Sequence, residues 1–258
     1  MLPNLHWAII PIGPLHIQVW GLFVALGMAV AIIVARQFAK QRKLNPDLVL
    51  DAAFWTILAA LIGGRLFFVV TEWAIFSGTL LDVFKIWQGG MSISGGFIGA
   101  VIAGVLFFRA KHVSFWEYAE VIVYALPLGL FIGRLGCFFI FDHPGTVTDF
   151  FLGEVYYGDG LVRHNHGLYL ALSGLVLFGL FTYLRFKAKA QAPYFVTIFL
   201  IWDGAVRLWL DNYRISDAEF FGLTAAQWIG IVAVIAGLAI FGQRQNIRKR
   251  FLNKPKVS

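Results

Sequence analysis

Charged residues are scarce in this sequence. Only 14% of the 258 residues are Asp, Glu, Lys or Arg, whereas a soluble globular domain carries about 25%. Hydrophobic residues make up 59%. They gather in runs of about 17–22 residues, the length needed to cross the roughly 30 Å hydrocarbon core of a bilayer. An ordinary water-soluble domain is therefore excluded, and the sequence predicts a single membrane domain over residues 1–258.

Cysteine is almost absent as well, because Cys137 is the one cysteine of the chain. A single thiol excludes an internal disulfide and any site built from several cysteines. His164 and His166 lack a clear third ligand, so we expect no metal and no cofactor. Walker A, dinucleotide-binding and G-x-S-x-G motifs are missing. No Lys or Arg precedes Arg36, so we expect the first apolar run to remain as a helix rather than to be cleaved as a signal peptide.

Seven apolar runs predict an all-α polytopic membrane protein. Because lipid cannot satisfy backbone hydrogen bonds, isolated spanning segments must be helices. The predicted spans are residues 19–38, 52–73, 91–108, 121–141, 167–186, 194–210 and 225–241.

The positions of Lys and Arg predict the orientation. Basic residues cluster after the first, third and fifth runs and in the C-terminal tail, whereas the opposite side has only Lys85, Arg163 and Arg214. Because cytoplasmic loops carry the excess of basic residues, the N-terminus is expected outside and the C-terminus inside the cytoplasm. The formal charge of +7 is spread over loops, so we expect no nucleic-acid partner. The longest outer segment is residues 142–166, between helices 4 and 5.

Three arginines lie inside apolar runs: Arg65, Arg134 and Arg207. A charge near the bilayer centre costs about 2.5–3.5 kcal/mol, so each needs a partner or a water-filled cavity. From the helix rise, all three lie within roughly 12 Å of the outer face. This shared depth favours a site for an anionic head group, because guanidinium binds phosphate in a planar fork. The alternative is that each long side chain reaches the interface by itself.

Asp203, Arg207 and Asp211 follow each other at a spacing of four residues, which predicts an acid–base–acid row on one helix face. Either the row is a structural ion pair that allows Arg207 to be buried, or the aspartates orient the guanidinium for a ligand. Both interpretations remain open from the sequence.

The outer segment begins with Asp142 and His143, shortly after Arg134. Imidazole can take a proton near neutral pH, so His143 is a candidate general base. The alternative is an ordinary wetted turn at Pro144 and Gly145.

Several motifs occur in a fixed order along the chain. They are IGP at 12–14, WG at 20–21, GGR at 63–65, WQGGMSISGG at 87–96, GRLGCF at 133–138, R-H-x3-L-Y at 163–169, and GAVR at 204–207 with Asp211 after it. With these motifs over nearly its whole length, the chain resembles the prolipoprotein diacylglyceryl transferase family of bacterial inner-membrane enzymes. The stretch 87–96 matches the family's W-x-G-G-M-S-x-H-G-G except at Ser94, where the family has histidine. Other departures are Trp20, Cys137, Leu170 and Asp203, for the family's Tyr, Asn, Glu and Tyr, and Asp142 and Asp211, for its Glu.

The resemblance implies transfer of the diacylglyceryl group of phosphatidylglycerol to the lipobox cysteine of a preprolipoprotein or to a related acceptor, with release of glycerol phosphate. It implies that Arg134 and Arg207 hold the phosphate and stabilise its leaving charge. A base must help to form the acceptor thiolate, and since Ser94 is neutral, His143 or Asp142 is expected to serve. The residues expected to bind substrate are Arg65, Ser94, Gly95, Gly96, Cys137, Arg163, His164, Tyr169, Asp203 and Asp211.

Two other function classes remain open from the sequence. A paralogue that kept the arginine site without a base would be a non-catalytic membrane protein that binds lipid or a partner. An anion transporter would also use the arginines, although the inverted repeats typical of transporters are not recognisable. Gly95 and Gly96 allow either helix packing or the approach of a head group.

Overall fold

A computed structural model describes residues 1–13, 15–76, 80–85, 90–141, 143–187, 194–215 and 219–252 of the chain, which is mostly helical. The helices are α1 (Val19–Gln41), α2 (Asp47–Thr71), α3 (Trp73–Phe76), α4 (Ile93–Ala110), α5 (Phe115–Ile140), α6 (His166–Lys187), α7 (Phe195–Leu210) and α8 (Ala225–Leu252), with 3₁₀ turns η1 (Leu80–Phe84) and η3 (Asp211–Tyr213). Each predicted run overlaps one long helix, so the mostly helical character of the chain is confirmed.

Five helical segments are long and apolar enough to cross a membrane: Val19–Gln41, Asp47–Thr71, Phe115–Ile140, His166–Lys187 and Ala225–Gln243. The apolar part of α4, Gly95–Ala110, and the 16 residues of α7 are shorter. The number of seven spans and their orientation therefore stay predictions.

Large apolar side chains on these helices point away from the protein interior. Val70 is 74% exposed, Val232 is 64% exposed and Val176 is 57% exposed. Exposed apolar area on this scale is unusual for a protein in water. It is the pattern expected where lipid rather than water surrounds the helices, in agreement with the hydropathy of the sequence.

The chain divides into two compact units. The first contains residues Met1–Ile33 and Ile122–Ser258, and the second contains Val34–Val121. Whether the two units make one membrane domain, as the composition predicts, stays a prediction.

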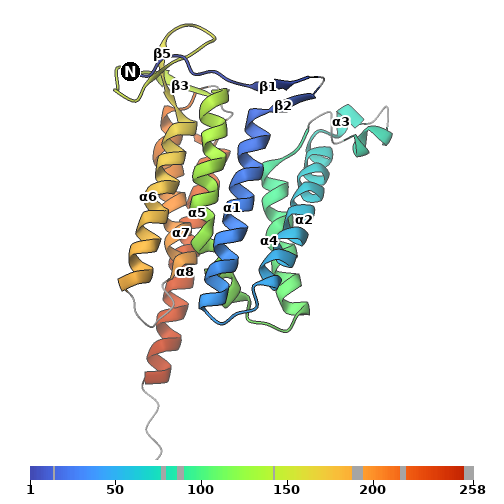
Figure 1. The fold of residues 1–258 in the computed structure, drawn as a ribbon, viewed down its shortest axis with the longest axis vertical. Helices are drawn as coiled ribbons and strands as arrows, with labels where there is room; N and C mark the ends of the chain where they lie inside the picture. Colours follow the sequence, from blue (N-terminus) through green and yellow to red (C-terminus); the bar gives the residue numbers. More distant parts are fainter. Residues whose placement is uncertain are drawn as a thin grey trace, which may run out of the picture. The chain divides into compact units, whose positions relative to one another are not determined.

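In the second unit, α2 and α4 lie side by side (Figure 1). Their contact depends on glycine, because a Cβ on Gly95 would collide with the carbonyl oxygen of Gly63. Ser92 caps α4, since its hydroxyl oxygen accepts a hydrogen bond from the backbone N–H of Gly95 at 3.4 Å. Gly95 is thus a packing residue. Gly96 also faces α2, where a Cβ would lie 3.2 Å from the carbonyl oxygen of Ala60.

In the first unit, α5 packs against the first part of α1, and α7 packs against α8 and α6 (Figure 1). Glycines allow the closest contacts. A Cβ on Gly129 of α5 would lie 2.9 Å from the carbonyl oxygen of Gly27 of α1, and a Cβ on Gly204 of α7 would lie 2.5 Å from that of Gly230 of α8. Small residues at such crossings are how membrane helices gain van der Waals contact.

Short strands join the first unit at one end of its helices. β3 (Pro144–Val147), β5 (Val162–Asn165) and β4 (Glu154–Val155) form an antiparallel sheet in the order β3-β5-β4. The hairpins β1 (Ile9–Ile12) with β2 (Leu15–Gln18) and β6 (Glu219–Phe220) with β7 (Leu223–Thr224) complete the strands. The predicted outer segment 142–166 therefore contains a small sheet rather than an irregular loop.

Candidate functional site

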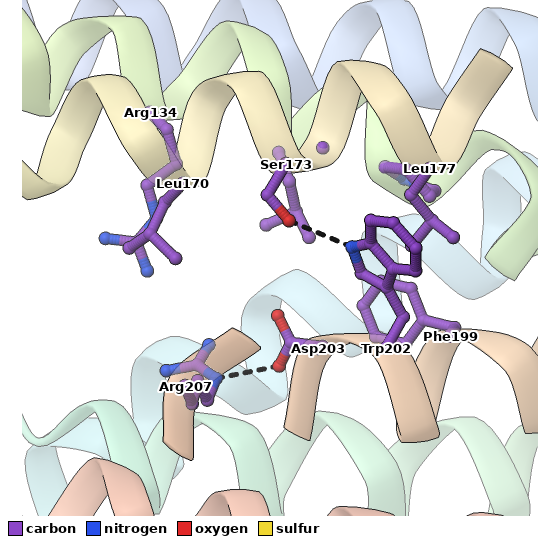
Figure 2. A pocket seen from close by; sticks show the side chains of 11 residues that line it. Arg134, Leu170, Ser173, Leu177, Phe199, Trp202, Asp203 and Arg207 are labelled. Atoms are coloured by element: carbon purple, nitrogen blue, oxygen red, sulfur yellow. Dashed lines mark hydrogen bonds and ion pairs between the residues drawn. The ribbon is translucent and has the colours of Figure 1, made fainter. Parts of the chain in front are cut away.

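A pocket lies between α5, α6 and α7 of the first unit (Figure 2). Its volume of about 20 Å³ holds about one water molecule, so a larger ligand has to displace side chains at its edge. The lining residues are Pro127, Leu130, Arg134, Leu170, Ser173, Gly174, Leu177, Phe199, Trp202, Asp203 and Arg207.

Pro127 and Gly174 set the distance between two walls of the pocket. Pro127 lies inside α5, and a Cβ on Gly174 of α6 would lie 2.8 Å from its carbonyl oxygen. Only a glycine allows α6 to approach α5 this closely without a shift of the backbone. The two helices consequently bring Arg134 and Ser173 to the same cavity.

Arg207 has an acidic partner on its own helix. Its Nε donates a hydrogen bond to Asp203 Oδ2 at 2.7 Å, an i, i+4 contact drawn in Figure 2. The two side chains are 28% and 25% exposed. Because the Nε edge of the guanidinium holds the carboxylate, no contact among the described residues occupies its two Nη groups, and these remain available for a further acceptor.

Arg134 reaches into the pocket from the opposite wall (Figure 2). Its one hydrogen-bond contact among the described residues joins Nη1 to Cys137 Sγ at 3.9 Å. No carboxylate of the described chain lies within ion-pair distance of it. The pocket therefore holds two guanidinium groups and one carboxylate. An uncompensated positive charge between apolar helices favours the binding of an anion.

The opposite part of the pocket is mainly apolar. Leu177 and Phe199 line it, and the indole N–H of Trp202 donates to Ser173 Oγ at 2.9 Å. The sequence analysis did not single out Ser173 or Trp202. Only contact between α6 and α7 makes them neighbours, and no local pattern signals that contact. A cationic end and an apolar end match an anionic amphiphile.

Arg65 belongs to the second unit and has a different environment. Its guanidinium is buried, and it donates to the carbonyl oxygens of Asp82 at 2.6 Å, Val83 at 2.8 Å and Gly90 at 2.8 Å. It also lies over the ring of Phe76, 5.1 Å from the centroid. These contacts hold the segment after α3 against α2. The structure thus does not place Arg65 in the pocket of Arg134 and Arg207, and a role in substrate binding stays a prediction.

Asp211 lies directly after the end of α7 and has side-chain partners of its own. The helix α7 ends at Leu210, and the Asp211 carboxylate accepts a short hydrogen bond from Thr224 Oγ1 and lies 3.5 Å from Arg214 Nη1. The Asp211 carboxylate thus ties η3 to the start of α8. Because the backbone N–H of Asp211 still bonds to the carbonyl oxygen of Arg207, the acid–base–acid row stays a prediction at its last member.

Arg163 fastens the small sheet. Its guanidinium donates to Asp159 Oδ2 at 2.8 Å and to the carbonyl oxygen of Gly145 at 3.0 Å. The hydrogen bond from Arg163 lowers the pKa of Asp159 below its usual range. These contacts give Arg163 a structural task, and its predicted contact with substrate stays a prediction.

His164 and Tyr169 lie together at the start of α6. His164 Nδ1 shares a 2.7 Å hydrogen bond with Tyr169 Oη, and its ring centroid lies 4.9 Å from that of Tyr213. Burial lowers the pKa of His164 below its usual value. The imidazole is therefore neutral at pH 7.

The two residues predicted to act as the base, His143 and Asp142, stay predictions. His143 is exposed directly before β3 and is not among the residues that line the pocket. Asp142 lies outside the described residues, as does the side chain of Ser94. Among the described residues, no group of three His, Cys, Asp or Glu side chains is arranged to hold a metal ion.

Glu154 is a fully buried carboxyl that the sequence analysis did not single out. It accepts hydrogen bonds from Asn165 Nδ2 at 2.6 Å and from the backbone N–H of Leu5 at 3.1 Å. Burial raises the pKa of Glu154 above its usual value. The backbone N–H of Leu2 also donates to the carbonyl oxygen of Gly153 at 2.8 Å. These contacts attach the N-terminal segment to the sheet.

Comparison with known proteins points to one family. The profile of the prolipoprotein diacylglyceryl transferase family matches residues 8–242. Proteins named phosphatidylglycerol–prolipoprotein diacylglyceryl transferase are similar over most of the chain. The protein of Geobacillus kaustophilus (strain HTA426) is 31% identical over 241 residues, 89% of each chain. That of Nostoc sp. (strain PCC 7120) is 29% identical over 244 residues, 90% of this chain and 86% of the relative. That of Streptococcus pneumoniae (strain Hungary19A-6) is 29% identical over 238 residues, 90% and 91%.

Proposed function

Because the chain belongs to the prolipoprotein diacylglyceryl transferase family, we propose that it is the transferase that moves the diacylglyceryl group of phosphatidylglycerol to a cysteine of a preprolipoprotein. The protein then works as a multi-pass enzyme of the bacterial inner membrane, with seven spans, its N-terminus outside and its C-terminus inside. The pocket and the small sheet then lie toward the outer leaflet, where the basic residues are few.

The chemistry is a substitution at carbon. The acceptor thiol loses its proton to a base, and the thiolate sulfur attacks the glyceryl carbon that carries the phosphate. A thioether S–C bond forms while the C–O bond to phosphate breaks. The bonding electron pair leaves with the phosphate oxygen, and glycerol phosphate is released. The negative charge that develops on the leaving phosphate is what the site has to stabilise.

One observation carries the proposal: Arg134 and Arg207 enter one pocket from different helices with only Asp203 to balance them. On this proposal Arg134 and the free Nη edge of Arg207 hold the phosphate of phosphatidylglycerol. Guanidinium suits this task because its fork matches two phosphate oxygens. The apolar lining of Leu177 and Phe199 supports the binding of the adjoining acyl chains.

The base comes from the segment between α5 and α6, at the end of the helices where the small sheet lies. The sequence nominates Asp142 and His143 in this segment, and both stay proposals. The remaining residues predicted from the resemblance, Gly96, Ser94 and Cys137, also stay proposals as substrate contacts. Of these, Cys137 is supported by its contact with Arg134.

The test is release of glycerol phosphate from phosphatidylglycerol by purified protein with a lipobox peptide. We expect peptide-dependent release by the unaltered protein and a loss of about 10²–10³-fold in Arg134→Ala, the effect typical of removing one donor to a developing anion. Arg109→Ala is the matched control, because Arg109 is an exposed arginine at the end of α4. Folded protein that releases no glycerol phosphate, or an Arg134→Ala variant as active as the control, would refute the proposal.

A further inference from the structure

The reaction needs a base, and the histidines of the chain occupy very different positions. His6 Nδ1 forms a hydrogen bond with the carbonyl oxygen of Ile140 at 2.9 Å. His166 is buried at the start of α6. His16 lies in the β1–β2 hairpin, and His112 follows α4 in the second unit. A base for an incoming thiol has to be partly accessible and close to the pocket helices.

His164 meets this requirement through its two tyrosine contacts. Tyr169 follows His164 onto α6, is the residue before pocket-lining Leu170, and lies four residues from Ser173, on the same helix face. Tyr213, on the other side of the imidazole, lies in η3 directly after α7. His164 therefore lies between the ends of the two helices, α6 and α7, that supply most of the pocket lining.

The hydrogen bond to Tyr169 can fix the imidazole tautomer that a base requires. With the proton on Nδ1 donated to Tyr169 Oη, the lone pair of Nε2 is left to accept a proton. No contact among the described residues occupies Nε2. The imidazole is half-buried, and the titratable groups around it are Tyr169, Tyr213 and the adjacent His166. Because burial lowers its pKa, His164 is unprotonated at neutral pH.

From this geometry we infer that His164 is the general base of the transfer and that Tyr169 is its positioning residue. The inference rests on the proposed function and names the base that the reaction requires. Nε2 takes the proton of the acceptor thiol, the sulfur forms the bond to the glyceryl carbon, and the C–O bond breaks toward the phosphate. The imidazolium then returns its proton to the released glycerol phosphate or to water.

His143 is the competing residue, and the structure separates the two. His143 is exposed and precedes β3, whereas His164 is half-buried between the pocket helices. A residue that only lines the entrance would affect binding of the acceptor, while the base would affect the chemical step. The two roles predict different changes in KM and kcat.

The experiment compares His164→Ala, His143→Ala and His16→Ala in the glycerol phosphate assay at pH 7 and pH 9. We expect His164→Ala to lose about 10²–10⁴-fold in kcat at pH 7, the usual contribution of a general base. The loss should shrink at least tenfold at pH 9, because a thiol with a pKa of about 8.5 then ionises without help. His143→Ala should change the KM for the peptide rather than kcat, and the exposed control His16→Ala should remain within about threefold of the unaltered protein.

Tyr169→Phe keeps the aromatic ring and removes only the hydroxyl. We expect a loss of about tenfold in kcat with unchanged KM, the size of one net hydrogen bond. The same loss at pH 7 and pH 9 in His164→Ala would overturn the inference, since it would show a structural role. Full activity of His164→Ala, or a loss confined to His143→Ala, would also overturn it while leaving the transferase proposal intact. An unaltered protein without activity would instead refute the proposed function itself.

Discussion

Arg134 and Arg65 are both arginines within apolar helices, yet their surroundings differ. Arg65 donates to three backbone carbonyl groups within 2.8 Å and lies over an aromatic ring. Arg134 faces a pocket with one weak contact to sulfur. The first guanidinium is satisfied by the protein itself, whereas the second is left for something else. An intramembrane arginine thus points to a ligand only when the fold leaves its donors unused.

The largest expected contrast is between Arg65→Ala and Arg134→Ala. Removing Arg65 leaves three partly buried carbonyl groups without their donor, so we expect the free energy of unfolding to fall by about 3–5 kcal/mol. Removing Arg134 should leave stability close to that of Arg109→Ala. Thermal and denaturant unfolding in the same detergent measures both. Equal destabilisation by the two substitutions would contradict the claim that Arg65 is structural and Arg134 is not.

Asp211→Ala should behave like Arg65→Ala on a smaller scale. Thr224 and Arg214 lose their shared acceptor, and we expect a loss of about 1–3 kcal/mol in unfolding free energy. The KM for phosphatidylglycerol should stay unchanged, because Asp211 is not among the residues that line the pocket. An altered KM with unchanged stability would return Asp211 to the binding site.

Asp203→Asn sharpens the description of the pocket. The substitution removes the one carboxylate beside Arg207 while keeping a similar shape. The pocket becomes more positive but its guanidinium is less firmly oriented, so we expect KM for phosphatidylglycerol to fall and kcat to fall about tenfold, or about 1.4 kcal/mol. Steady-state kinetics over a range of lipid fractions measures both. A rise in KM would mean that Asp203 contacts the lipid directly.

The smallest effect on stability is expected for Glu154, which is not among the residues that line the pocket. Because burial raises its pKa above the ordinary 4.5, the unfolded chain ionises first as the pH rises. Stability is therefore fully present below pH 4.5 and falls as the pH rises through the pKa of the folded state. Glu154→Gln should reduce the difference in Tm between pH 4.5 and pH 7. An unchanged difference would show that Glu154 does not contribute to it.

The sequence predicts the helices well because hydropathy is a local property. Each apolar run became one helix, although α5 begins at Phe115 rather than at residue 121 and α8 continues to Leu252. The site is harder to predict because contacts between distant segments decide it. Nothing near Arg65 in the sequence signals that Asp82 and Gly90 will bind it. Likewise, no local pattern near Asp211 signals its contact with Thr224.

The spacing of Asp203 and Arg207 was a sound guide because both lie within one helix, where four residues bring two side chains together. The membership of Arg134 and Arg207 in one pocket was suggested by their depth and by the family resemblance, and depth does not distinguish them from Arg65. Only the packing of α5, α6 and α7 separates the two cases.

Equilibrium binding of phosphatidylglycerol to the purified protein, followed by native mass spectrometry, tests the central claim most directly. The unaltered protein and Arg109→Ala should bind phosphatidylglycerol in preference to phosphatidylcholine. Arg134→Ala should bind phosphatidylglycerol at least tenfold more weakly, because it lacks one of the two guanidinium groups that hold the phosphate. Binding by Arg134→Ala that equals that of Arg109→Ala would contradict the assignment of the pocket to the phosphate.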